Sequence, residues 1–282
     1  MVPTSGHRSR SGSHSRVLVK IGILGKGVVG STCGIGFNML GHTLVYHDPK
    51  LKTTIESTLD SDIVFVCVPT PGNSDGGCDT TLVRNVVSEL INLSYQGVIA
   101  IKSTVTPGTV QSLIEQHNNP DICCVPEFLR EHCALADFVK YHHLLAVGCG
   151  TDRAWHTVCD AHAWLPQHKQ RLTPTEAEIL KYMSNAFNAT RVVFANVMYE
   201  LCKIHGSDYQ QVLNAYLARG TACADYMQCG PELRGYGGLC LPKDVKAMAK
   251  LCRDLGLPFE LLNCIDQDNA QLQTTIFSGM RQ

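Results

Sequence analysis

Cys240 follows a glycine-rich stretch at 235–238 and is itself followed closely by Lys243 and Asp244. The reactive form of a cysteine is the thiolate, which a nearby ammonium group favours. A flexible backbone that presents such a thiol beside titratable side chains suits a nucleophile in covalent catalysis. Because the chain has 14 cysteines, most of them are expected to be small buried hydrophobic residues. The glycine-rich loop and the charged neighbours distinguish Cys240 as the candidate nucleophile.

Two further pairs of polar residues have spacings that suit acid–base chemistry. Glu127 and Glu131 follow the apolar run 122–125 and would share one face if their segment were helical. Either carboxylate could then orient a water or a sugar hydroxyl, and the alternative is a solvated first turn of a helix. Lys181 and Asn185 lie four residues apart on a predicted helix, where spacing alone favours ordinary surface polarity.

A glycine-rich turn near the start of the chain predicts a dinucleotide site. Gly25, Gly27 and Gly30 follow the apolar run 17–24, and Asp48 ends the next apolar run. Such glycines allow a tight turn, the approach of a pyrophosphate and close packing of the following helix, whose N-terminus favours the phosphate charge. An acid at the second strand end accepts hydrogen bonds from ribose hydroxyls and repels a 2′-phosphate, which favours NAD over NADP. The alternative is a strand-turn-helix whose glycines serve packing alone.

Small hydroxyl residues follow two more apolar runs. Thr70 stands after the run 63–68, and Ser103 and Thr104 stand after the run 97–101. Ligands of open α/β sheets bind at the carboxyl ends of the strands, so these residues are candidates for cofactor contacts. Ordinary turn chemistry is the alternative.

His156, Cys159 and His162 recur at intervals of three, which is a spacing that zinc ligands can have. The chain contains no Cys-x-x-Cys pair, and only His168 is available nearby as a fourth ligand. A helix with a polar stripe explains the pattern better, and we expect no metal.

The elements that must position these residues fall into two classes. Short apolar runs alternate with helical segments such as 81–93, which indicates β-α units and a doubly wound parallel sheet. We therefore predict an α/β, Rossmann-type NAD-binding domain over residues 17–172. The apolar runs are 17–24, 43–46, 63–68, 97–101, 122–125 and 143–147.

After residue 173 the pattern becomes helical. Segments 175–205, 209–217 and 260–277 have helical spacing, so residues 173–282 are predicted to form an all-helical central domain. Residues 1–16 are rich in Ser, Gly, Arg and His and lack an apolar stretch, so we expect a disordered leader or tag there.

Composition excludes several classes of protein. Of 282 residues, 44% are hydrophobic and 17% are charged, which is typical of a globular protein. With 24 Lys and Arg against 25 Asp and Glu, no basic excess suggests nucleic acid or a membrane surface as a partner. No run of 18 apolar residues predicts a membrane span. The many cysteines, without a secretory signal, indicate reduced thiols and a cytoplasmic location.

Taken together, these motifs resemble the UDP-glucose/GDP-mannose dehydrogenase family. The similarity covers residues 18–279 and includes, in the family's order, GKGVVG, the acid Asp48, VPTP, KSTVTPGT, PEFLRE, AEILKYMSNAFNATRV and GYGGLCLPKD. The cysteine loop and PEFLRE are specific, whereas the glycine trio alone would not be.

The resemblance implies oxidation of the C6 alcohol of a nucleotide sugar, most commonly UDP-glucose, to a carboxylate with two NAD⁺. Cys240 then looks like the nucleophile that forms a thiohemiacetal and then a thioester. Lys181, Asn185 and Asp244 would stabilise oxyanions and order a water. Glu127 resembles the acid/base for thioester hydrolysis, with Glu131 and Thr104 in support.

The resemblance also implies the remaining contacts. The sugar nucleotide would be held by Phe128, Leu129, Arg130, Glu131, Tyr236, Gly237 and, reaching into a neighbouring subunit, Arg219. The cofactor would be held by Gly25, Gly27, Val28, Val29, Gly30, Asp48, Val68, Pro69, Thr70, Ser103, Thr104 and Lys243. The last helical segment resembles the long central helix through which family members form homodimers.

One departure from the family is large. Family members continue into a third domain that binds the UDP of the substrate, whereas this sequence ends at Gln282. We therefore expect a minimal form, a truncated chain or a protein whose partner supplies the missing part. Two alternatives to the leading function stay open. One is a β-hydroxyacid-type dehydrogenase that performs a single oxidation without a nucleophilic thiol, and the other is a non-catalytic NAD-binding subunit.

Overall fold

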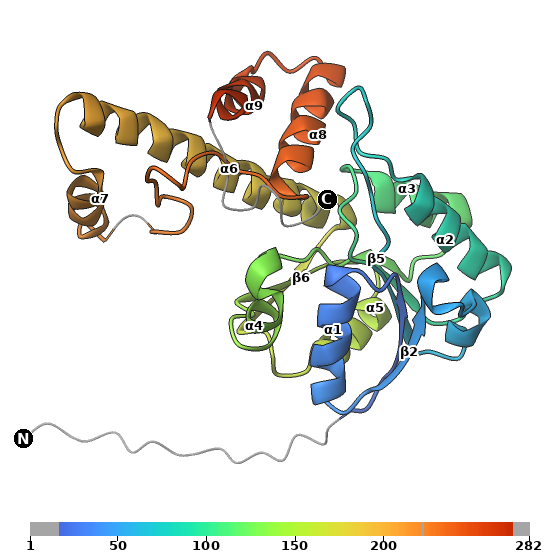
Figure 1. Ribbon diagram of the computed structural model, residues 1–282. Coiled ribbons are helices and arrows are strands. Elements are labelled where there is room, and N and C mark those ends of the chain that lie inside the picture. The colour runs from blue at the N-terminus through green and yellow to red at the C-terminus, as the bar shows by residue number, and fades with distance from the viewer. Residues whose placement is uncertain (1–16, 221–222, 273–282) are drawn as a thin grey trace, which may run out of the picture.

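The computed structural model describes residues 17–220 and 223–272, and the predicted leader at 1–16 lies outside the described residues. Its first part is a seven-stranded sheet in the order β2-β1-β3-β4-β5-β6-β7, with helices on both sides (Figure 1). The strands are β1 (Lys20–Leu24), β2 (Thr43–His47), β3 (Ile63–Val66), β4 (Val98–Ile101), β5 (Ile122–Cys124), β6 (Leu144–Gly148) and β7 (His168–Leu172).

The doubly wound Rossmann-type sheet is confirmed, with one departure from purely parallel pairing. Strands β1 to β5 pair in parallel, while β5 meets β6 antiparallel through Cys124 and Gly148. Strands β6 and β7 are parallel to each other and therefore run opposite to the other five.

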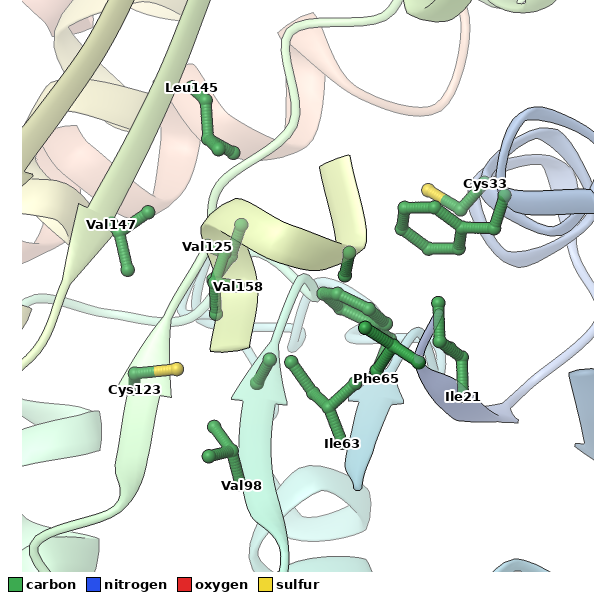
Figure 2. Packing of buried hydrophobic residues seen from close by; sticks show 14 of the residues in the cluster. Ile21, Cys33, Ile63, Phe65, Val98, Cys123, Val125, Leu145, Val147 and Val158 are labelled. Atoms are coloured by element: carbon green, nitrogen blue, oxygen red, sulfur yellow. The ribbon is translucent and has the colours of Figure 1, made fainter. Parts of the chain in front are cut away.

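The sheet separates two hydrophobic cores. One face packs on α1 (Val28–Met39), α4 (Ala134–Val139) and α5 (Asp152–His162), and its core includes Cys33, Phe65 and Val158 (Figure 2). The other face packs on α2 (Thr81–Asn92) and α3 (Thr109–His117). Because side chains alternate along a strand, neighbouring apolar residues of β3 and β4 enter opposite cores, which explains their continuous apolar runs.

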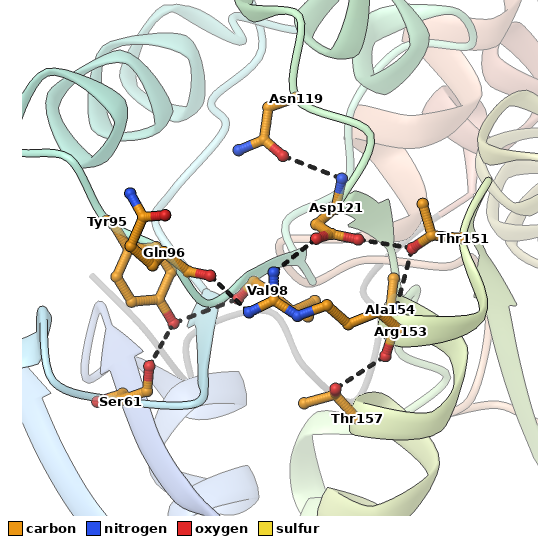
Figure 3. A network of polar contacts seen from close by, with 10 residues as sticks. All are labelled: Ser61, Tyr95, Gln96, Val98, Asn119, Asp121, Thr151, Arg153, Ala154 and Thr157. Atoms are coloured by element: carbon orange, nitrogen blue, oxygen red, sulfur yellow. Dashed lines mark hydrogen bonds and ion pairs between the residues drawn. The ribbon is translucent and has the colours of Figure 1, made fainter.

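A polar network holds the amino ends of the central strands (Figure 3). Arg153 donates one hydrogen bond to the Asp121 carboxylate (2.8 Å) and another to the carbonyl of Gln96 (2.5 Å). Thr151, the N-cap of α5, donates to the other Asp121 oxygen (2.6 Å). Since this edge is closed by structural contacts, the opposite, carboxyl edge of the sheet is the one available for a ligand.

The second part is helical and is built on one long helix, α6 (Pro174–Ile204). Thr173 and Glu176 cap it reciprocally, and Pro174 occupies its first turn, which is a favourable helix start. Helices α8 (Leu241–Asp254) and α9 (Leu261–Gln271) pack on one half of α6, and α7 (Tyr209–Leu217) packs near its far end (Figure 1).

Four expectations need correction. The predicted sheet lacked β7, because this edge strand is polar and exposed and carries no apolar signal. Residues 241–254 form α8, a segment for which no element was predicted. Glu127 and Glu131 share no helix face, since only a short 3-10 turn, Glu131–Cys133, forms in their segment. The long central helix is α6, whereas the last helix, α9, has 11 residues and ends at Gln271.

All fourteen cysteines lie in the described part of the chain as free thiols. Within residues 17–220 and 223–272, every helix is too short or too polar to cross a bilayer.

Candidate active site

The turn from β1 into α1 has the geometry that a dinucleotide requires. Gly25 has φ +95°, and a Cβ there would lie 2.7 Å from the carbonyl oxygen of Cys67. A Cβ on Gly30 would collide with the carbonyl oxygen of Gly25, so the helix can approach the strand only without a side chain. At Gly27 the same atom would meet nothing within 4 Å, which leaves open space where a pyrophosphate approaches.

A cavity of about 620 Å³ lies in front of this turn, lined by Lys26, Gly27, Val28, Ser31, Lys50 and Glu131 among others. Asp48 directly follows β2 beside it and accepts hydrogen bonds from the backbone N–H of Lys26 (2.7 Å) and of Lys50 (2.9 Å). These bonds hold the pKa of Asp48 below its usual value, so the carboxylate is ionised and ready to accept ribose hydroxyls. The open space at Gly27 and the anionic Asp48 carboxylate fit the pyrophosphate and the ribose of NAD.

The hydroxyl residues after β3 and β4 form one edge, as predicted. Ser103 Oγ donates to the carbonyl of Val68 (2.7 Å), which ties the two loops together. Thr70 is buried there, and the carbonyl of Thr104 accepts a weak hydrogen bond from the Cys78 thiol (3.6 Å). These loops follow the carboxyl ends of the strands, where the cofactor domain meets the helical part.

Glu127 and Lys181 form a buried ion pair across the two parts of the chain. Lys181 Nζ donates to the backbone carbonyl of Glu127 (2.6 Å) and to its Oε1 (3.1 Å), and both side chains are more than 90% buried. Glu127 Oε2 accepts the N–H of Leu129 (2.7 Å), which fixes the carboxylate. Burial works against the Lys181 charge, yet the nearby anionic groups outweigh it, and the pKa of Lys181 is raised.

Asn185, one turn further along α6, contacts α8. Its Nδ2 donates to Asp244 Oδ2 (2.6 Å), while Lys243 Nζ pairs with Asp244 Oδ1 (2.6 Å). The Asp244 carboxylate is 1% exposed, so these two donors compensate a buried charge. Asn185 and Lys181 are both buried, so their spacing does not reflect surface polarity.

Cys240 is the N-cap residue of α8, and its carbonyl accepts the N–H of Asp244 (2.9 Å). It reaches solvent, but the surrounding chain desolvates the thiol enough to raise its pKa above the usual value. Lys181 and Lys243 oppose this effect, whereas Glu127 and Asp244 add to it. The thiol is therefore surrounded by two ammonium groups and two carboxylates. Because its pKa is raised, a base must remove the thiol proton before the sulfur can act as a nucleophile near neutral pH.

Other predicted residues lie outside this cluster of Cys240, Lys181, Asn185, Glu127 and Asp244. The Arg130 guanidinium makes two hydrogen bonds to Asp137. Arg219, just after α7, places its guanidinium over the ring of Tyr216, 6.0 Å from the ring centroid. The ring of Tyr236 is buried in the core between α6, α8 and α9. Its backbone N–H donates to Asn269 Oδ1 (2.7 Å) and its carbonyl accepts from Asn269 Nδ2 (3.0 Å), so Tyr236 is held on α9.

Two features of the site were not predicted from the sequence: the position of Glu131 and the contact made by Glu178. Glu131 lines the cofactor cavity and not the cysteine cluster, because its segment is not helical. Glu178, one turn before Lys181, is a buried carboxylate bonded to α3, and its position inside the motif AEILKYMSN was the available signal. In the described ranges no three His, Cys, Asp or Glu side chains gather as metal ligands, and His162 is enclosed by Phe37 and Phe65.

Comparison with known proteins gives two family matches. Residues 47–160 match the UDP-glucose/GDP-mannose dehydrogenase family, NAD binding domain, and residues 175–271 match the central domain of the same family. UDP-glucose 6-dehydrogenase AglM of Haloferax volcanii is 28% identical over 90% of this chain and 70% of its own length. A UDP-glucose 6-dehydrogenase of Rhizobium meliloti is 30% identical over 86% of this chain and 66% of its own.

The solved structure of a UDP-glucose dehydrogenase from Pyrobaculum islandicum superimposes with a TM-score of 0.82 at 27% identity. The superposition covers 91% of this chain and 69% of the Pyrobaculum chain. The chain thus spans about two thirds of the length of these relatives. Both family matches lie on the two parts that carry the cofactor cavity and the cysteine cluster. The chain therefore belongs to the UDP-glucose/GDP-mannose dehydrogenase family and contains its NAD-binding and central domains.

Proposed function

We propose that this protein oxidises the C6 alcohol of a nucleotide sugar to a carboxylate with NAD⁺, through a covalent intermediate on Cys240. The observation that carries the proposal is the position of the thiol. Cys240 lies among Lys181, Glu127 and Asp244, where the helical part meets the carboxyl edge of the cofactor-binding sheet. A protein that only binds NAD has no use for a thiol in that setting.

The first half of the reaction converts the alcohol into an aldehyde by loss of a hydride and a proton. Bound NAD⁺ supplies the hydride acceptor in both oxidations. Lys181 and Asn185 lie on one face of α6, where their N–H groups can stabilise negative charge on the C6 oxygen. The Cys240 sulfur then adds to the aldehyde carbon, its proton passes to a base, and the resulting oxyanion stays near the same donors.

The second half converts this thiohemiacetal into a thioester by loss of a second hydride. Water then attacks the thioester carbon, and the Cys240 thiol leaves with a proton. Glu127 is held through Oε2 by the Leu129 N–H, so its Oε1, shared with Lys181, is the oxygen that can accept a proton from the water. Asp244, held by Asn185 and Lys243, orders the same region.

UDP-glucose is the substrate we test first, because the named relatives from Haloferax and Rhizobium are UDP-glucose 6-dehydrogenases. The test counts the NADH formed per molecule of UDP-glucose by the purified protein, with Cys240→Ser and Cys264→Ser as a matched pair of variants. Cys264 is also an exposed thiol, on α9. We expect two NADH per sugar in the wild type and in Cys264→Ser, and loss of turnover in Cys240→Ser.

Other outcomes favour the alternatives. One NADH per substrate and full activity of Cys240→Ser would support a β-hydroxyacid-type dehydrogenase. NAD binding without NADH formation from UDP-glucose, GDP-mannose or related sugars would support a non-catalytic subunit.

We also infer that the protein forms a homodimer through α6. Seven apolar side chains on this helix are exposed at intervals of three, four or seven residues and form one stripe. The residues of the α6 stripe are Ile179, Met183, Phe187, Phe194, Val197, Leu201 and Ile204. A contiguous apolar surface of this kind is rare on a monomer, and a symmetric pair of helices would cover it.

Two smaller expectations accompany this proposal. We place the domain boundary between residues 172 and 173, where β7 ends and the cap of α6 begins. A cytoplasmic location stays a prediction, supported by the free thiols.

A further inference from the structure

Glu178 is a buried carboxylate that the reaction described above does not use. It lies in the first turns of α6, is 2% exposed, and points away from that helix toward α3. Its Oε2 accepts the backbone N–H of Gly108 (2.6 Å), and its Oε1 accepts that of Val110 (2.8 Å). One carboxylate thus binds two backbone donors in a helix of another part of the chain.

Those two donors would otherwise be unsatisfied. Gly108 is the N-cap of α3, and neither a side-chain cap nor an acidic residue in the first turn of α3 is present. The N–H groups of a first helical turn have no partner within their own helix, and they carry the positive end of the helix dipole. Glu178 therefore supplies from α6 the cap that α3 lacks in its own sequence.

The position of this contact relates it to the active site. Gly108 is four residues after Thr104, on the loop that joins β4 to α3 and carries the predicted cofactor contacts. Lys181 is three residues after Glu178, which is less than one turn of α6. Glu178 thus connects the cofactor loop to the helix turn that carries Lys181.

We propose that Glu178 is a positioning residue for the reaction: by capping α3, it fixes the Thr104 loop relative to Lys181 and Cys240. This inference rests on the proposed function for its catalytic consequence, but its structural part does not. Glu178 touches neither substrate nor cofactor in this account, and it acts through the spacing of the two parts of the site.

The charged and titratable groups near Glu178 come from two neighbouring elements and from α6 itself. Arg84 on α2 favours its ionised form, while Cys124 on β5 and Tyr182 on α6 are the titratable groups that face it. Burial is the dominant influence and raises the pKa of Glu178 to about 7. Above that pH both oxygens can accept an N–H, and below it one oxygen carries a proton and accepts poorly.

The test compares Glu178→Gln with Glu176→Gln. Both residues cap a helix N-terminus, but Glu176 caps its own helix on the exposed side, through the backbone N–H of Thr173. Glutamine at 178 keeps the shape, accepts only one N–H and turns an amide N–H₂ toward the other. We expect kcat with UDP-glucose at pH 8 to fall about tenfold and the Kd for NAD⁺ to rise about fivefold, with KM for the sugar changed less than twofold.

Amide hydrogen exchange supplies a readout that needs no turnover. The Gly108 and Val110 amides should exchange about tenfold faster in Glu178→Gln, measured against the Ser112 amide, which bonds to the Gly108 carbonyl within the same helix. Because the pKa of Glu178 is about 7, kcat of the wild type should rise with an inflection near pH 7, and this inflection should be absent in Glu178→Gln. Glu176→Gln should change neither the exchange nor the inflection.

Each remaining outcome decides the inference. Unchanged exchange or unchanged kcat in a folded Glu178→Gln would overturn it, and so would an equal loss of kcat in Glu176→Gln. If the wild type makes no NADH, the proposed function fails, while amide exchange and NAD⁺ affinity still test the link. If Glu178→Gln does not fold, Glu178→Asp replaces it in the test. Aspartate keeps the charge but reaches only one N–H, so the Gly108 and Val110 amides should exchange about threefold faster than in the wild type.

Discussion

At the scale of single residues, the reactivity of Cys240 is set by opposing neighbours. Burial raises the pKa of the thiol, and Lys181 and Lys243 lower it, so the thiol is mainly protonated at pH 7. Since only the thiolate is alkylated, the rate of modification by iodoacetamide should rise with pH from 7 to 9. Lys181→Met removes the larger of the two positive charges that stabilise the thiolate. We therefore expect the rate of Cys240 alkylation at pH 8 to be about fivefold lower in this variant.

This prediction is checked by mass spectrometry of the Cys240 peptide over time, with Cys264 as the internal reference. A rate that is independent of pH over that range would contradict the raised pKa. A Lys181→Met variant with wild-type kinetics would show that this ammonium group does not influence the thiol.

The Glu127–Lys181 pair predicts a stability effect as well. Removing one member of a buried, hydrogen-bonded ion pair leaves the other charge without compensation, which costs about 3 kcal/mol or more. Lys181→Met should therefore lower the free energy of unfolding by that order in urea titrations. Lys50→Met, at the exposed edge of the cofactor cavity, should change it by less than about 0.5 kcal/mol.

At the scale of elements, the turn between β1 and α1 separates folding from cofactor binding. Gly27→Ala places a methyl group in open space, so we expect unfolding free energy within about 1 kcal/mol of wild type. The same methyl group occupies the cradle for the pyrophosphate, and affinity for NAD⁺ should fall about tenfold. Calorimetric titration with NAD⁺ and urea unfolding measure the two effects.

Gly30→Ala is the matched variant three residues away. Its methyl group would collide with the carbonyl oxygen of Gly25, and rigid backbone on both sides leaves little room to adjust. We expect a loss of about 3 kcal/mol in unfolding free energy. Equal stability of the two variants would mean that close helix–strand packing does not depend on this glycine.

At the scale of the whole molecule, Glu178 should couple stability to pH. Its pKa in the folded protein is about 7, above the ordinary value of 4.5, so the folded state binds a proton more tightly than the unfolded one between these values. The stabilisation is therefore complete below pH 4.5 and is lost as pH rises through 7, by up to about 3 kcal/mol. His142 and His162 act in the opposite sense, because burial lowers the pKa of each.

The difference between wild type and Glu178→Gln isolates the Glu178 contribution from that of the histidines. Urea unfolding at pH 5, 6, 7 and 8 should show the wild type losing stability relative to the variant as pH rises. A constant difference across this range would exclude a Glu178 pKa near 7.

The α6 stripe makes the oligomeric state testable. Phe194→Glu places a charge in the middle of the stripe, and light scattering after gel filtration should show a monomer. Ile35→Glu, at an exposed apolar position on α1, is the control and should remain a dimer. A monomeric wild type would contradict the inferred dimer.

Much of this architecture could be predicted from local signals. Strands β1 to β6 coincide with apolar runs, the glycine turn precedes a helix, and Asp48 directly follows β2, because each signal depends on neighbours within a few residues. Strand β7 gave no such signal, since its exposed polar residues pair with β6 only along the edge. Helix α8 was not predicted, although Pro242 and Asp244 in its first turn are typical of a helix start.

The sequence by itself determined which residue types could do chemistry and in which order they occur. It identified the thiol at 240, the acid at 48 and the Lys–Asn pair on a helix, because motif and spacing are local properties. The tertiary structure decided which of them meet. Only the packing of α6 and α8 on the sheet edge brings Lys181 to Glu127 and Asn185 to Asp244, over separations of 54 and 59 residues. Such contacts are set by the burial of distant surfaces, and no local spacing encodes them.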